Sequence, residues 1–262
     1  MSLRARSPRR PRYIVHDDWK FVYFVVQKVA CTSIKTALLP LFDTEATGQD
    51  VTEASGQDVF LEDGTPRLRV HKLFDRSGYQ INKEQLTAKL NGEYQQYFKF
   101  AFVRNPWDRL VSCYCEKLTK NGSGLNLPAG VDIELYAGMP FAEFVEAVCE
   151  IPDDQANPHF RSQHTVICGR GEDRTTIASL FDRFRERDKP IMADFVGRYE
   201  NLAADFSVVA ERIGGTEKLE LPHILRSKSR ESRPYTEFYD ARLKKLVYER
   251  YQEDIEIFGY SF

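Results

Sequence analysis

"FVYFVVQKVACTSIK", residues 21 to 35, changes character halfway along its length. The run from Phe21 to Val26 is apolar, aromatic and β-branched, which is typical of a short strand buried on both faces of a sheet. A loop follows, and the residues from Thr32 or Ser33 to Leu39 suit a helix. The stretch therefore predicts a strand, a loop and a helix, with hydroxyl groups at the start of the helix.

A second stretch, "YFKFAFVRNPWDRLVSCYCEKL" at residues 97 to 118, has the same plan. Phe98 to Val103 predicts a buried strand, and Pro106 suits the first turn of a helix whose apolar residues recur at helical spacing. Arg104 then stands at the carboxyl end of the strand, and Ser112 lies two turns into the helix.

The remaining elements predict an α/β fold, with a central parallel sheet flanked by helices. Ligands of such sheets bind beyond the carboxyl ends of the strands, where both stretches point. We expect residues 1–12 to form a disordered basic tail and residues 13–262 to form a single domain. Further expected elements are a strand over 13–26 interrupted by a turn near "HDDWK", helices over 141–149 and up to Gly214, a strand over 194–196, and one long closing helix over 235–258.

Composition excludes several classes of protein. The 262 residues carry a net charge of -2, so the basic excess of a general nucleic-acid binder is missing. The sequence shows neither a membrane span nor a signal peptide. The cysteines show no zinc-site spacing and predict a reducing compartment. We therefore expect a cytoplasmic protein, for which a bacterial origin is compatible. The alternative left open is that an N-terminal anchor has been lost.

The first loop favours an anionic ligand such as phosphate or sulfate. A helix N-terminus presents unpaired N–H groups, Thr32 and Ser33 add hydroxyl donors, and Lys28 adds a mobile positive charge. The alternative is that a hydroxyl only caps the helix while the lysines are solvated. A nucleotide-triphosphate P-loop is disfavoured because this loop contains no glycine.

The second loop supplies Arg104, whose guanidinium is suited to bidentate phosphate recognition. An arginine at a strand end is equally often structural, for example paired with Asp108 four residues later. The residues alone leave both roles open.

Together the two stretches resemble the sulfotransferase family. "QKVACTSIK" is similar to its 5'-phosphosulfate loop, and "FAFVRNPWDRLVSCY" is similar to its 3'-phosphate motif, in which a serine follows an arginine by eight positions. The likeness is strongest to the carbohydrate sulfotransferase branch, the Golgi-type sulfotransferase-2-like enzymes, and "HFRSQHTVIC", "FVGRYENLAADF" and "EDIEIFGYSF" extend it along the chain. Gln27 and Ala30 stand where this loop often has proline and glycine.

The resemblance implies a P-loop-like three-layer fold and transfer of a sulfuryl group from 3'-phosphoadenosine-5'-phosphosulfate to a hydroxyl, without a metal. Lys28 would neutralise the departing phosphate oxygen. The residues expected to bind the donor are Lys28, Cys31, Thr32, Ser33, Arg104, Ser112 and Lys228; an exposed basic loop is the alternative reading of Lys228.

The acceptor is expected to be a carbohydrate or another polyhydroxylated molecule. Its hydroxyl needs a base, for which His71 is our first candidate and His159 the second. We expect His159, Arg161 and Gln163 to contact the acceptor, with the loops at 44–59 and 120–140 setting specificity. Two alternatives remain: a nucleotide-dependent phosphotransferase, and a non-catalytic module that binds sulfated or phosphorylated ligands.

Overall fold

The computed structural model describes residues 11–42, 74, 78–120, 122–169, 191–214, 219–222 and 233–262. Within these residues a five-stranded sheet has the order β3-β1-β2-β4-β5. Four strands run in one direction and β1 runs against them, because β1 pairs antiparallel with both β2 and β3, whereas β2, β4 and β5 pair in parallel. The strands are β1 (Arg12–His16), β2 (Phe21–Phe24), β3 (Gln80–Asn82), β4 (Phe98–Val103) and β5 (Phe195–Arg198).

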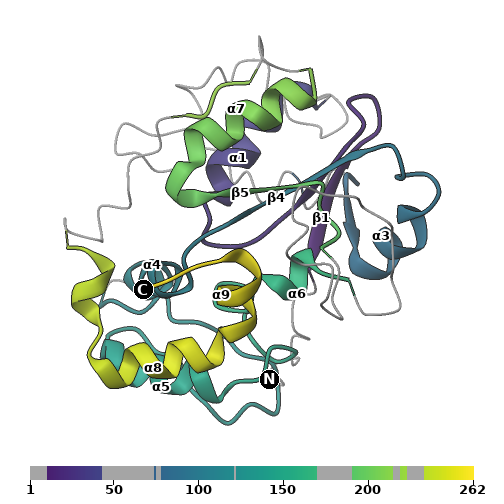
Figure 1. The fold of residues 1–262 in the computed structure, drawn as a ribbon. Helices are drawn as coiled ribbons and strands as arrows, with labels where there is room; N and C mark the ends of the chain where they lie inside the picture. Colours follow the sequence, from purple (N-terminus) through teal and green to yellow (C-terminus); the bar gives the residue numbers. More distant parts are fainter. Residues whose placement is uncertain are drawn as a thin grey trace.

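Helices lie on both sides of this sheet. Figure 1 shows α1 and α7 on one side and α4, α5, α8 and α9 on the other. The described helices are α1 (Cys31–Leu38), α3 (Lys83–Leu90), α4 (Pro106–Lys117), α5 (Phe141–Glu150), α6 (His164–Ile167), α7 (Leu202–Arg212), α8 (Ala241–Arg250) and α9 (Gln252–Phe258), with 3₁₀ turns at Leu39–Leu41, Tyr199–Asn201 and Tyr235–Phe238. The mixed α/β architecture predicted from the sequence is thus confirmed, with β1 as an antiparallel exception.

The apolar side chains form two clusters. The larger surrounds the sheet, where aromatic rings of neighbouring strands meet, as in the stacked pair of Tyr23 and Phe100, whose centroids are 5.1 Å apart. The smaller joins α4, α5 and α8 and includes Trp107. α4 therefore connects the sheet to the helical layer, because it follows β4 directly and packs on α8.

The sequence pattern located most of these elements but not all. The strand at 98–103 and the helix beginning at Pro106 are as expected, and a turn at 17–20 joins β1 to β2. The prediction of a single closing helix over residues 235–258 is wrong, because this segment divides into a 3₁₀ turn, α8 and α9. Asp240 starts α8 by accepting a hydrogen bond from the Leu243 N–H at 2.7 Å, and Tyr251 has non-helical backbone angles between α8 and α9.

None of the helices in the described parts of the chain combines the length and apolar composition that crossing a membrane requires. All five cysteines fall within the described residues, and none of them is in a disulfide bond there.

Candidate functional site

Three loops meet at one edge of the sheet. β2, β4 and β5 are parallel neighbours, so their carboxyl ends point the same way. The residues that follow these ends are the loop with Lys28, the Arg104–Asn105 pair, and the turn that begins at Tyr199. The expectation that Lys28 and Arg104 come together is met, since Arg104 Nη1 donates to the Lys28 carbonyl at 3.2 Å.

The loop after β2 is left-handed at two residues. Lys28 has φ +68° and Ala30 has φ +64°, although neither is glycine. Ala30 is the N-cap of α1, and the carbonyl of Ala30 accepts from the Ile34 N–H at 3.0 Å. A left-handed residue followed by a helical one turns successive backbone N–H groups toward one point, which is an anion-binding arrangement. Ala30 therefore takes the conformation that glycine would favour.

The first turn of α1 contains Cys31, Thr32 and Ser33. Cys31 is buried and its thiol donates to Gln27 Oε1 at 3.2 Å, which closes the loop across its base. Neither hydroxyl caps the helix, because the N-cap is Ala30 and no side chain caps it. Among the described residues Ser33 has no hydrogen-bonding partner for its hydroxyl.

Arg104 is held on several sides. Its Nε donates to Asp108 Oδ2 at 2.7 Å, and its guanidinium lies 3.9 Å from the centroid of the Tyr199 ring. The structural pairing with Asp108 is therefore present, and it also fixes the guanidinium plane at the edge where Lys28 lies. Ser112 comes one turn after Asp108 on α4, and within the described residues its partly exposed hydroxyl has no hydrogen-bonding partner.

Lys28 forms an ion pair that the sequence analysis missed. Its ammonium contacts Glu116 Oε2, and Lys117 contacts the other carboxylate oxygen, Oε1, at 2.7 Å. Burial alone would raise the pKa of Glu116, but the charges of Lys28 and Lys117 lower it to about 2. The signal was present in the spacing, since Asp108, Ser112 and Glu116 recur every four residues and share one face of α4.

Arg109 was also missed, and it ties two loops together from beneath. Its side chain is 2% exposed and donates to the carbonyls of Gln27 at 2.9 Å, Arg161 at 2.8 Å and Pro158 at 3.3 Å. Burial lowers the pKa of Arg109. Because helical spacing only places Arg109 on a buried face, its carbonyl partners could not be identified from the sequence.

His159 follows Pro158, whose carbonyl accepts from Arg109, and the hydrogen bonds around its ring indicate which ring nitrogen carries the hydrogen. Asn157 Nδ2 donates to the Asn126 carbonyl at 2.9 Å, so Asn157 Oδ1 faces His159, whose backbone N–H and Nδ1 lie 3.1 and 2.7 Å from it. An amide oxygen only accepts, so Nδ1 carries the hydrogen and Nε2 keeps its lone pair. Burial, followed by the charges of Lys117 and Lys28, lowers the pKa of His159 to about 3.

Gln163 and Arg161 bind the protein itself. Gln163 is fully buried; its Nε2 donates to the Arg104 carbonyl and its Oε1 accepts from the Arg104 N–H, both at 2.9 Å. Arg161 donates to the carbonyls of Asp153 at 3.1 Å and Ala156 at 2.7 Å. The geometry therefore gives both residues a supporting role within the protein, and their contact with the acceptor stays a prediction.

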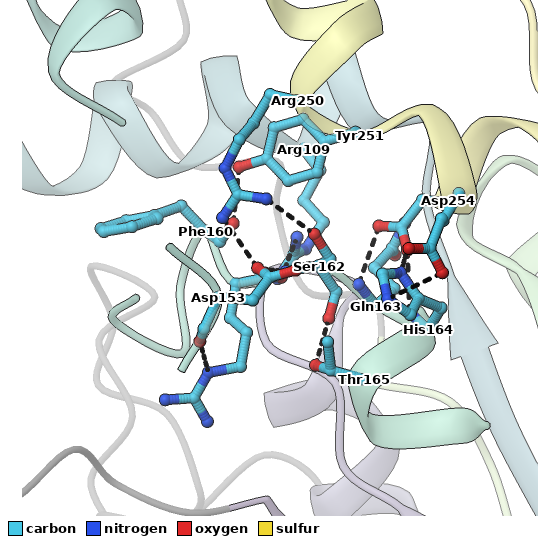
Figure 2. Close-up of polar contacts among 12 residues, drawn as sticks. Arg109, Asp153, Phe160, Ser162, Gln163, His164, Thr165, Arg250, Tyr251 and Asp254 are labelled. Atoms are coloured by element: carbon cyan, nitrogen blue, oxygen red, sulfur yellow. Dashed lines mark hydrogen bonds and ion pairs between the residues drawn. The ribbon is translucent and has the colours of Figure 1, made fainter. Parts of the chain in front are cut away.

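Figure 2 shows the buried network behind these residues. Asp254 is fully buried and accepts from the N–H groups of Gln163 at 2.7 Å and His164 at 2.8 Å, and it lies 2.8 Å from His164 Nδ1. Asp153 accepts from Arg250 Nη2 at 2.7 Å. Thus α8 and α9 hold the segment that carries His159 and Gln163.

The residues at 260–262 close the same region. Asn105 donates to the Ser261 carbonyl at 2.8 Å, and Phe262 packs edge-on against Trp107 with ring centroids 5.5 Å apart. Asn105 N–H also donates to Glu200 Oε1 at 2.7 Å. The loop after β4 is therefore fixed from two elements that lie far along the chain.

Some expected residues lie outside the described parts of the chain: His71, Lys228 and the loop at 44–59. Their roles stay predictions. In the described residues no three histidine, cysteine or acidic side chains gather as metal ligands, and the expectation of metal-free chemistry also stays a prediction.

The amino-acid sequence of this chain is similar to the sequences of known proteins. The pattern that defines the Sulfotransferase family matches residues 11–261. Carbohydrate sulfotransferase 11 of Mus musculus is 25% identical over 282 residues, which cover 98% of this chain and 70% of the relative. Carbohydrate sulfotransferase 12 of Xenopus laevis is 24% identical, covering 94% of this chain and 59% of the relative. No solved structure matches significantly. Because the family pattern spans almost the whole chain, the protein belongs to the sulfotransferase family.

Proposed function

We propose that this sulfotransferase uses 3'-phosphoadenosine-5'-phosphosulfate as donor and a carbohydrate hydroxyl as acceptor. The contact of Arg104 Nη1 with the Lys28 carbonyl at 3.2 Å carries the proposal, because it joins the two cationic loops at one edge of the sheet. One loop would hold the 5'-phosphosulfate and the other the 3'-phosphate. The matched relatives are named carbohydrate sulfotransferases, which supports the acceptor class.

Each donor residue has a role that its surroundings support. The left-handed Ala30 and the first turn of α1, with Thr32 and Ser33, offer N–H and hydroxyl donors to the 5'-phosphosulfate. Lys28 neutralises the bridging oxygen as its bond to sulfur breaks. Arg104, fixed by Asp108 and Tyr199, and Ser112 bind the 3'-phosphate.

His159 is the acceptor base in this proposal. Its Nε2 lone pair takes the proton of the acceptor hydroxyl while the acceptor oxygen bonds to sulfur and the adenosine 3',5'-bisphosphate leaves. The low pKa of His159 keeps its ring neutral at physiological pH. Burial is the main cause of the low pKa, and the negative charge that the donor brings to Lys28 opposes only the smaller contribution of the lysines.

Ligand-induced thermal stabilisation tests the donor. Adenosine 3',5'-bisphosphate at 100 times its dissociation constant should stabilise the protein by about 2.7 kcal/mol, a rise of roughly 5–10 °C in Tm. Adenosine 5'-diphosphate and magnesium-ATP at matched concentration should give less. A preference for magnesium-ATP would instead indicate phosphotransfer.

Transfer of labelled sulfate to a panel of desulfated polysaccharides then tests the reaction. His159→Gln should lower turnover by about 100-fold or more, with unchanged affinity for adenosine 3',5'-bisphosphate. His71→Gln is measured in parallel: if only that variant loses turnover, His71 is the base. Donor binding without transfer to any acceptor would favour the non-catalytic module.

A further inference from the structure

Each carboxylate oxygen of Glu116 contacts a different lysine. Oε2 contacts the Lys28 ammonium, and Oε1 lies 2.7 Å from the Lys117 ammonium. The Lys28 side chain is only 10% exposed, whereas the Glu116 side chain is 43% exposed. With its pKa held at about 2 by these charges, Glu116 is ionised at neutral pH. A largely buried cation of the proposed donor site is thus paired with a carboxylate whose side chain is nearly half exposed to solvent.

The two cations of the donor site are paired in different ways on the same helix. Asp108 and Glu116 lie eight residues apart on one face of α4 and contact Arg104 and Lys28, respectively. The Arg104–Asp108 pair is buried on both sides, with side chains 5% and 11% exposed, so we expect it to persist. Glu116 can turn into solvent without leaving a charge buried, because nearly half of its side chain is already exposed.

An incoming phosphosulfate has the same sign of charge as Glu116. Two anions at one ammonium repel each other, and the pairing is relieved when one of them moves away. Lys117 offers Glu116 a second partner that does not depend on Lys28. The exchange therefore leaves Lys28 with the ligand and Glu116 with Lys117, and every charge remains compensated.

We propose that Glu116 is an internal counter-ion of Lys28, which the 5' end of the donor displaces when it binds. This proposal rests on the proposed function and adds a residue that acts against binding. Glu116 holds the Lys28 side chain in place in the unliganded protein, at the expense of donor affinity. Competition with Glu116 for Lys28 should lower the affinity only of ligands that carry an anionic 5' group.

Titration calorimetry with two nucleotides tests the exchange. Glu116→Gln removes the charge but keeps the shape, so it should bind adenosine 3',5'-bisphosphate about three- to tenfold more tightly than wild type. Adenosine 3'-monophosphate, which lacks the 5' group, should change by less than about twofold. The matched control is Glu146→Gln, because Glu146 is 44% exposed and pairs with Arg242 on other helices; it should leave both affinities unchanged.

Two further results decide the matter. In a Lys28→Ala background the gain from Glu116→Gln should disappear, since the competition acts through Lys28. Unchanged or weaker binding of the bisphosphate by Glu116→Gln, or an equal gain for both nucleotides, would overturn the exchange while the donor site stands. If wild type binds neither nucleotide, the proposed function fails, and the exchange fails with it.

Discussion

Replacing Arg109 with methionine tests whether one buried side chain holds the loop with Lys28 and the segment with His159 in place. Methionine keeps an unbranched apolar stem, is shorter than arginine and removes every donor. The two hydrogen bonds to Gln27 and Arg161, at 2.9 and 2.8 Å, contribute about 1.5 kcal/mol each, and the 3.3 Å bond to Pro158 about 0.5 kcal/mol. Avoiding the burial of a guanidinium returns roughly 1 kcal/mol. We expect Arg109→Met to lower the free energy of unfolding by about 2–3 kcal/mol.

Thermal and denaturant unfolding measure this loss, which corresponds to a fall of roughly 4–12 °C in Tm. Arg109→Lys should lose a similar amount, because an ammonium cannot reach three carbonyls with fork geometry. Arg242→Met removes an exposed arginine paired with Glu146 and should change stability by less than about 1 kcal/mol. If Arg109→Met unfolds like Arg242→Met, the three hydrogen bonds give no net stability. If it is destabilised but, where folded, binds adenosine 3',5'-bisphosphate like wild type, Arg109 does not position the loop.

Three other substitutions have expected outcomes. Ala30→Gly removes left-handed strain of about 1–2 kcal/mol but stabilises the unfolded chain by about 0.5–1 kcal/mol through its entropy. The free energy of unfolding should therefore rise by up to about 1.5 kcal/mol, and a lower Tm would argue against strain. Tyr23→Phe removes a buried hydroxyl that has no partner among the described residues, and stability measured by denaturant should rise by up to about 1 kcal/mol, whereas a fall would reveal a partner. The pKa of His159 is about 3 in the folded protein and about 6.5 in the unfolded chain. Because the unfolded chain binds the proton first, the free energy of unfolding is highest above pH 6.5 and falls toward pH 3, by at most about 1.4 kcal/mol per pH unit. His159→Gln should flatten the stability profile between pH 6.5 and 4, and parallel profiles for both proteins would contradict the shifted pKa.

The sequence predicted those parts of the fold whose signals are local. The apolar run at 98–103 and Pro106 mark a strand end and a helix start independently of their surroundings, and both were correct. The closing segment failed because apolar spacing continues across its breaks, so the Asp240 cap was outweighed by periodicity. β3 and α3 were missed because a three-residue strand of half-buried residues and a helix with two buried leucines give weak patterns.

For the candidate site, the sequence identified groups but not their partners. Lys28 and Arg104 were found because each follows an apolar strand, and parallel strands bring such residues to one edge. Gln163 could not be distinguished from an acceptor ligand, since its pairing with the Arg104 backbone spans 59 residues of sequence. The same reason hides the carbonyl partners of Arg109 and the pairing of Glu116 with Lys28, which are contributed by loops more than 45 residues away.

The hydrogen bond from Asn105 to the Ser261 carbonyl joins residues that are 156 positions apart in the sequence. During synthesis the ribosome therefore makes β2, β4 and both cationic loops long before it makes the residues that secure the loop after β4. Because contacts between residues far apart in the sequence form slowly, we expect the edge of the sheet at the end of β4 to stay incompletely packed until the C-terminal residues have been made. A chaperone that binds at this stage would act on a chain that has its strands while the loop after β4 is not yet held in place.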